Sequence, residues 1–271
     1  MIMTYKEFTQ KLNTKIMADQ AFYNSLLIKV VSNPHRFTGI FRLSNVKNKL
    51  IQYVTQSREI RFGDFMEDIV TEYIRRMGYI VLDKRIKDFD KNKNYNIDQL
   101  FRKENNLFLV EQKIRDDHDS TKKTGQFDNF RKKYSLLRSI YPQHDIHASM
   151  WFIDDGLVKN KNYYLSEIAR DKTINLKLSI TYGQELFEQI FGNISAWEEI
   201  CSYLSKNKAE RNQEALDIPD FDTSTEMWIA LVNLKEKRPT LFKKLISEDK
   251  NYVQLREELF PTGENLNRLI N

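Results

Sequence analysis

The sequence predicts an α/β fold in which a central mixed β-sheet is flanked by helices. Two apolar runs, residues 94–101 and 107–114, are separated by the polar stretch 102–106, which suits a hairpin turn between antiparallel strands. Two further strands are expected around residues 146–153 and 176–182. A helical segment precedes the first of these, and a strand–helix–strand crossover favours parallel pairing. A sheet that contains both kinds of pair is mixed.

The strand expected at residues 107–114 ends in a polar pair. Side chains alternate along a strand, so Glu111 and Lys113 share one face, about 6.5–7 Å apart, and Leu107 and Leu109 precede them on that face. The pair therefore emerges at the carboxyl end of a buried strand. This is the usual place for a functional site in an α/β sheet.

Asp98, in the preceding strand, is expected to join this pair. If the hairpin is symmetric about Glu104–Asn105, Asp98 lies opposite Glu111 with Cβ atoms about 4.5–5.5 Å apart. A register shift of one residue would move Asp98 to the other face. Two carboxylates at that separation can hold one divalent cation. Mg²⁺ or Mn²⁺ is expected rather than zinc, because the four His and one Cys show no metal-ligand spacing.

The short motif alone is weak. An acidic residue two positions before Lys also occurs at Glu248-Asp-Lys250, and a surface ion pair on an edge hairpin would explain Glu111 and Lys113 equally well. Only the first occurrence ends an apolar strand and follows an Ile-Asp strand.

Residues 60–192, with Asp98 and Glu111-Gln-Lys113 on a hairpin, resemble the PD-(D/E)xK nucleases and among them the type II restriction endonucleases. The resemblance implies a restriction-endonuclease-like core in which Asp98 and Glu111 bind Mg²⁺, with Mn²⁺ as a substitute. It implies that Lys113 assists the attacking water. The sequence departs from the pattern at Ile97, where the name-giving proline stands.

The resemblance also implies partners. The expected substrate is double-stranded DNA cut at a specific short sequence, the expected assembly is a homodimer that reads a two-fold site, and a DNA methyltransferase is expected in the same system. A repair, junction-resolving or transposon-linked nuclease of the same fold would use the same residues. A non-catalytic nucleic-acid-binding protein is the alternative from another class, but paired carboxylates repel phosphate unless a cation intervenes.

A helix is expected over Phe62–Gly78, and it offers an accessory metal ligand. Apolar residues recur on one face at helical spacing, and Gly78 suits a C-cap. Glu67 lies at the edge of that face, so the resemblance implies that it points to the metal site. A solvated glutamate beside a core stripe is the alternative.

The polar stretch after Lys113 is expected to be a working loop that contacts DNA. Its side chains can neutralise phosphates or hydrogen-bond to them. The residues assigned to DNA binding are Arg115, Ser120, Thr121, Lys122, Lys123 and Gln126. His118, within the same stretch, is expected to be a solvent-exposed loop residue rather than a general base.

The next helix is expected to start near Gly125 and to end about Ile140. Its apolar face comprises Phe127, Phe130, Tyr134, Leu137 and Tyr141. Its opposite face is basic, with Arg131, Lys132, Lys133 and Arg138. Such a face is usually solvated surface, and its position beside the proposed active strand also suits tracking of phosphates.

Composition agrees with a polyanionic partner. The chain has 271 residues, with 43 Lys and Arg against 38 Asp and Glu, and a pI near 9.0. The single Cys201 excludes an intramolecular disulfide framework. No stretch resembles a signal peptide or a membrane span, so a cytoplasmic protein is expected.

The chain is expected to fall into three parts. Residues 1–60 are predicted to be helical, residues 61–192 to form the catalytic core, and residues 193–271 to be helical again. The flanking helices are expected to supply a dimer contact or to grip DNA. A helical cover over the sheet edges is the alternative.

Overall fold

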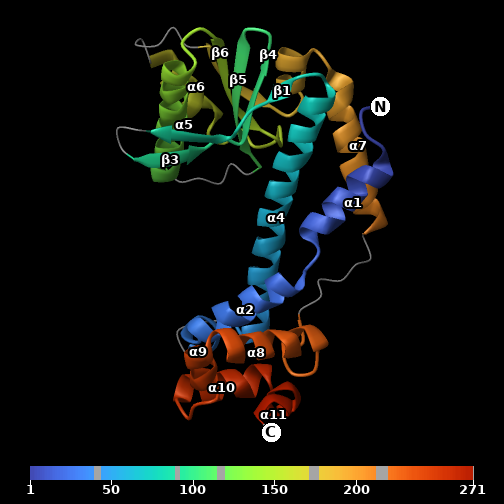
Figure 1. Ribbon diagram of the computed structural model, residues 1–271, viewed down its shortest axis with the longest axis vertical. Helices are drawn as coiled ribbons and strands as arrows, with labels where there is room; N and C mark the ends of the chain where they lie inside the picture. Colours follow the sequence, from blue (N-terminus) through green and yellow to red (C-terminus); the bar gives the residue numbers. More distant parts are fainter. Residues whose placement is uncertain (40–43, 89–91, 115–119, 171–176, 212–218, 271) are drawn as a thin grey trace. The chain divides into compact units, whose positions relative to one another are not determined.

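The computed structural model describes residues 1–39, 44–88, 92–114, 120–170, 177–211 and 219–270. Two compact units are present, and Figure 1 shows the elements that form them. The first comprises Met1–Leu12 and Gly63–Asn212, and the second Asn13–Phe62 and Gln213–Asn271. The division into three parts along the sequence stays a prediction.

A five-stranded mixed sheet forms the centre of the first unit, in the order β1-β4-β5-β6-β7. Its strands are β1 (Ile80–Val81), β4 (Gln99–Lys103), β5 (Asn106–Lys113), β6 (Asp145–Phe152) and β7 (Lys177–Tyr182). The pairs β1–β4 and β4–β5 are antiparallel, while β5–β6 and β6–β7 are parallel. The predicted mixed sheet is therefore confirmed, including the parallel pairing across the crossover helix.

Helices cover both faces of this sheet (Figure 1). Leu107 and Leu109 of β5 pack in one cluster with Phe127 and Phe130 of α5 (Ser120–Ile140). On the other face, Trp151 of β6 contacts the one-turn π-helix η1 (Phe187–Phe191) and α7 (Ile194–Glu210). The alternation of side chains along each strand therefore separates two apolar layers. Helix α6 (Lys161–Arg170) packs on the α5 side through Tyr164.

The strand expected at residues 94–101 is broken, which corrects the prediction. Strand β3 (Lys93–Asn96) pairs with β2 (Arg85–Asp88) in a separate two-stranded sheet, and β4 begins only at Gln99. The backbone N–H of Ile97 donates to the carbonyl of Lys84, so Ile97 continues the β2–β3 pairing by one residue. Residue alternation predicts extended backbone but does not show that a strand changes partners. Asp98 consequently lies at the bend between two sheets.

The second unit is helical, as predicted for these parts of the chain. It contains α2 (Gln20–Ser32), α3 (His35–Thr38), α8 (Thr225–Lys237), α9 (Pro239–Leu245), α10 (Lys250–Leu259) and α11 (Glu264–Ile270). The apolar face of α2 is buried against α8, and Leu26, Leu27 and Leu231 are completely enclosed. Such a layer of packed leucines is sufficient to hold short helices that would be marginal alone.

Helices α1 (Tyr5–Ile16) and α4 (Val46–Arg76) contribute residues to both units. The helix predicted at Phe62–Gly78 is therefore the second half of a longer one. Gly78 has a φ of +86°, which suits the left-handed turn expected after a helix end. None of the helices in the described part of the chain is long and apolar enough to cross a membrane.

Candidate active site

The β4–β5 hairpin has the register that the sequence predicts. Gln99 lies opposite Val110 and Leu100 opposite Leu109, with the turn at Glu104–Asn105. Extending this register by one residue places Asp98 opposite Glu111. The positive φ of Glu104, 53°, closes the turn with only two residues between the strands.

Asp98, Glu111 and Lys113 meet at the carboxyl end of β5. Lys113 Nζ is 3.7 Å from Asp98 Oδ2 and 3.6 Å from Glu111 Oε2, so one ammonium group contacts both carboxylates. Asp98 Oδ2 also accepts a hydrogen bond of 2.7 Å from the backbone N–H of Gln112. The bend before β4 thus fixes the Asp98 carboxylate against the neighbouring strand. The structure brings together all three residues that the sequence singled out.

Lys133 of α5 is a fourth member of this cluster, and its expected place on a solvated basic face is wrong. Its side chain is buried, and Nζ lies 2.6 Å from Glu111 Oε1. Glu111 is also buried, with both carboxylate oxygens beside an ammonium group. A signal for this contact exists in the sequence. Lys133 lies three residues after Phe130 and four before Leu137, which puts it within the apolar stripe of the helix.

Asp98, Glu111, Lys113 and Lys133 together carry two negative and two positive charges, so the cluster is neutral when all four groups are ionised. Burial raises the pKa of the Glu111 carboxyl, and the negative charge of Asp98 raises it further, against the opposing effects of Lys113 and Lys133. Carboxylate oxygens are ligands that Mg²⁺ and Mn²⁺ prefer, and a bound divalent cation would favour the charged form of both carboxylates. The donor set therefore fits the expected cation.

Glu67 is held by a different partner. Lys84 Nζ donates to Glu67 Oε1 at 2.8 Å and to the hydroxyl of Thr71 at 3.0 Å. Burial raises the pKa of Glu67, Lys84 lowers it, and the charge of Asp98 adds a smaller increase. Within the described ranges, no three His, Cys, Asp or Glu side chains come together as a metal-binding group. Glu67 thus lies within electrostatic range of Asp98 but is paired with a lysine.

The polar stretch after Lys113 is partly helical, which corrects the expectation of a loop up to Gly125. Residues 115–119, including Arg115 and His118, lie outside the described residues, but α5 begins at Ser120, five residues earlier than expected. Polar residues are typical of the exposed side of a helix as well as of loops, so polarity alone does not distinguish this first turn from a loop. The side chains of Ser120 and Thr121 also lie outside the description.

The remaining DNA-binding candidates lie in the first turns of α5. Lys122 is exposed. Lys123 Nζ lies 4.5 Å from the centre of the Tyr163 ring, and Gln126 accepts a long hydrogen bond of 3.5 Å from the hydroxyl of Tyr164. Both contacts join α5 to α6, so these two side chains have a packing role within the protein.

The fold and the site define the class of protein. A mixed sheet covered by helices on both faces, with two carboxylates and a lysine at the end of a central hairpin, is the arrangement of the PD-(D/E)xK nucleases. Residues 80–208 match the family model of HinfI, a type II restriction endonuclease. The match spans the whole five-stranded sheet, α5, α6 and most of α7. Over these residues the chain is similar to the type II restriction endonucleases, and this similarity supports a site-specific deoxyribonuclease. A comparison with curated proteins gave no match.

Proposed function

We propose that the protein hydrolyses phosphodiester bonds of double-stranded DNA at a specific short sequence, with Mg²⁺ as its cofactor. The observation that carries this proposal is the contact of Lys113 with both Asp98 and Glu111 at the end of β5. A structural ion pair needs one carboxylate. A second carboxylate in the same place raises the repulsion and is useful where a cation is bound.

Asp98 and Glu111 are assigned to metal binding, with Glu67 as an accessory ligand. Asp98 and Glu111 supply oxygen donors in fixed positions. The N–H of Gln112 orients the carboxylate of Asp98, and Lys133 orients that of Glu111. Glu67 would have to leave Lys84 to take part. Mg²⁺ commonly keeps several waters and uses only one or two protein carboxylates, so this donor set is sufficient. When bound, the cation supplies positive charge that polarises the scissile phosphate.

Lys113 is assigned to the attacking water. Its ammonium group contacts both carboxylates at the carboxyl end of β5. There it can hold a water by donating a hydrogen bond and stabilise negative charge that develops on the phosphate. Lys133 cannot take this role because it is buried behind Glu111. The two lysines therefore have separate roles, one toward substrate and one toward the carboxylate.

The remaining features of the proposal concern partners. Arg115, Ser120, Thr121, Lys122, Lys123 and Gln126 are assigned to DNA binding. A homodimer is proposed because a two-fold assembly reads a two-fold DNA site. Cleavage of foreign DNA requires that the host sequence be protected, so a DNA methyltransferase of the same specificity is proposed in the same system.

The test is cleavage of unmethylated phage DNA by the purified protein, with Mg²⁺ or with EDTA. Discrete fragments that appear only with Mg²⁺ are expected. Asp98→Ala and Glu111→Ala should each slow cleavage by more than about a thousandfold, since each removes a group that acts on the reacting charge. The matched controls are Asp128→Ala on α5 and Glu198→Ala on α7, two exposed carboxylates of the same unit.

Three results would contradict the proposal. A smear of fragments would mean cleavage without sequence specificity. Fragments in the presence of EDTA would remove the metal from the mechanism. Wild-type cleavage by Asp98→Ala or Glu111→Ala would remove these residues from the site.

A further inference from the structure

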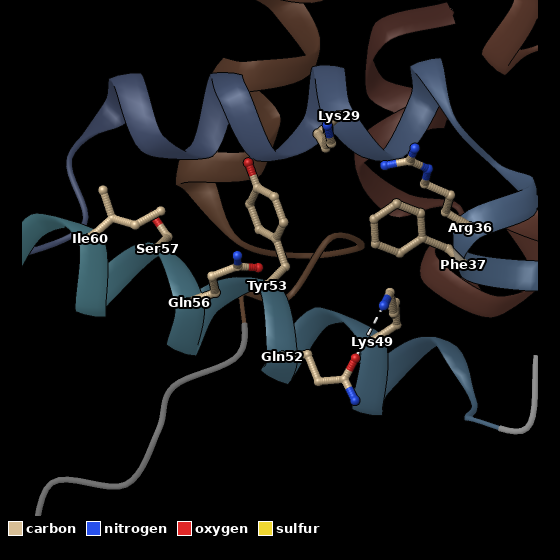
Figure 2. Close-up of a pocket in the computed structure, with 9 residues that line it drawn as sticks. All are labelled: Lys29, Arg36, Phe37, Lys49, Gln52, Tyr53, Gln56, Ser57 and Ile60. Carbon is tan, nitrogen blue, oxygen red and sulfur yellow. Dashed lines mark hydrogen bonds between the residues drawn. The ribbon is translucent and has the colours of Figure 1, made fainter. Parts of the chain in front are cut away.

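The second unit contains a groove between α2, α3 and the N-terminal half of α4. It is a cavity of about 390 Å³ that is open to solvent. Lys29, Arg36 and Lys49 line it, and none of the Asp or Glu residues that the structure describes does. Figure 2 shows the ring of Phe37 between Arg36 and Lys49, with Lys29 on the opposite wall from Lys49. Three cations thus surround one opening, and no carboxylate among the lining residues neutralises them.

The other lining residues suit a ligand that has both polar and apolar groups. Phe37 is buried and Tyr53 is half-buried, so two aromatic rings line the groove (Figure 2). Gln52 and Gln56 on α4 are exposed at its side, and Gln52 Oε1 accepts a hydrogen bond of 3.1 Å from Lys49. Amide groups can hydrogen-bond to phosphate and sugar oxygens, while aromatic rings can pack against deoxyribose.

The excess of basic over acidic residues in the second unit lies in the segment that forms this groove. Residues 13–62 contain eight Lys and Arg and only two Asp and Glu. Residues 213–271, which complete the same unit, contain eight Lys and Arg and eleven Asp and Glu. The groove therefore lies wholly in the basic half of a unit whose other half is acidic. A local excess of Lys and Arg in the segment that lines the groove favours attraction of a polyanion to it.

We infer that this groove binds the sugar–phosphate backbone of DNA, as a contact separate from the candidate active site. The inference rests on the proposed function, because DNA is taken to be the substrate. Lys29, Arg36 and Lys49 neutralise phosphates and release counterions, which supplies affinity without reading the bases. The family match ends at residue 208 and starts at residue 80, so it assigns nothing to this groove.

The experiment measures binding of a fluorescent DNA duplex at several salt concentrations. All proteins carry Asp98→Asn, so that the DNA stays intact. The test variant adds Lys29→Gln and Arg36→Gln, two exposed side chains. The control adds Lys237→Gln and Arg238→Gln, which remove one Lys and one Arg from exposed positions of the same unit outside the groove. The two variants therefore have the same net charge.

The test variant should bind about tenfold more weakly at ~0.1 M salt, and its plot of log affinity against log salt should be shallower by about 2, close to 0.9 for each lost phosphate contact. The control should keep the slope. The exchange Lys29→Arg with Arg36→Lys should keep it too, which separates charge from folding.

Each of three results would overturn the inference: equal losses in test and control, no loss in either, or a change in oligomeric state of the test variant without a change in DNA affinity. The last would make the groove a contact between copies of the chain. Failure of the proposed function is detected separately, as DNA left uncut by the wild-type protein with Mg²⁺. The binding slopes are interpretable in either case.

Discussion

The candidate active site of the first unit and the groove of the second place their positive charges in opposite settings. In the first, Lys113 and Lys133 lie against the carboxylates of Asp98 and Glu111. In the second, the groove formed by α2, α3 and α4 has three cations and no lining carboxylate. A lysine that contacts a carboxylate neutralises that carboxylate. A Lys or Arg side chain without a carboxylate beside it can bind an external anion. The net charge of +5 alone does not distinguish these settings.

The comparison also separates chemistry from affinity. Removing a lysine from the active site should change the fold or the reaction rate and leave the salt dependence of binding nearly intact. Removing a cation from the groove should do the reverse.

Lys133→Met should have the largest effect. It leaves the Glu111 carboxylate buried without its closest partner, and breaking a buried pair in this way lowers the free energy of unfolding by about 3–5 kcal/mol. Chemical denaturation measures this loss. Lys132→Met, one position earlier on the same helix, is the control because its side chain is partly exposed and its ion pair with Asp88 is long, 3.9 Å.

The double variant Glu111→Met with Lys133→Met sharpens this test. Replacing both partners by apolar side chains of similar size should restore most of the stability, because no buried charge is left unpaired. The protein should remain inactive. If Lys133→Met alone were as stable as the wild type, Lys133 would not be the residue that supports Glu111.

Lys113→Ala should slow cleavage by about 100- to 1,000-fold, the usual effect of removing one group that stabilises charge in the transition state. DNA affinity in the presence of Mg²⁺ should change little, because the two carboxylates remain. Single-turnover cleavage and duplex binding measure the two quantities. Lys103→Ala, at the far end of the same hairpin, is the control. Unchanged cleavage by Lys113→Ala would remove this lysine from the mechanism.

The hairpin shows what the sequence could predict. The register of β4 and β5 follows from a two-residue turn and from the alternation of apolar side chains, so the meeting of Asp98 and Glu111 was predictable. These are local properties of a continuous segment. The parallel pairing of β5 with β6 was predictable for a similar reason, since a crossover helix separates them.

Lys133 and the groove show what could not be predicted as easily. A lysine on a helix is exposed far more often than it is buried, and only its contact with Glu111, 22 residues away, makes its burial acceptable. The groove depends on how α2 and α4 pack, and the positions of its cations at residues 29, 36 and 49 follow no motif. Tertiary contacts decide both features.

Glu199 of the first unit is a carboxylate that is bound by backbone N–H groups and a hydroxyl and not by lysines. It accepts hydrogen bonds from the backbone N–H groups of Ile2 and Met3 and from the hydroxyl of Tyr73. Burial raises its pKa, but these donors lower it more, so the net pKa lies below the ordinary value of 4.5. The contribution of Glu199 to the free energy of unfolding is therefore fully present above about pH 4.5. It is lost as the pH falls through the lower pKa of the folded state.

Glu199→Gln should therefore lower the free energy of unfolding by about 1–2 kcal/mol at neutral pH. The difference from the wild type should shrink on acidification below 4.5. Thermal unfolding across this range measures it. The neighbouring Glu198→Gln, at an exposed position, should leave stability unchanged at every pH. A loss for Glu199→Gln that does not depend on pH would mean that packing, not charge, explains the role of this residue.

Substitution of Lys123 should have the smallest effect, because its ammonium group contacts an aromatic ring and is proposed to contact a phosphate as well. Its ammonium group lies over the ring of Tyr163, a contact worth less than about 1 kcal/mol at an exposed site. Lys123→Gln should therefore lower stability only slightly, but it should make the salt dependence of DNA binding shallower by about 0.9 if the first turn of α5 contacts one phosphate, as proposed. Tyr163→Leu removes the ring and keeps the charge, so it should retain the full slope. An unchanged slope in Lys123→Gln would leave this lysine with the packing of α5 on α6 alone, and the phosphate contacts would then have to come from other cations such as those of the groove.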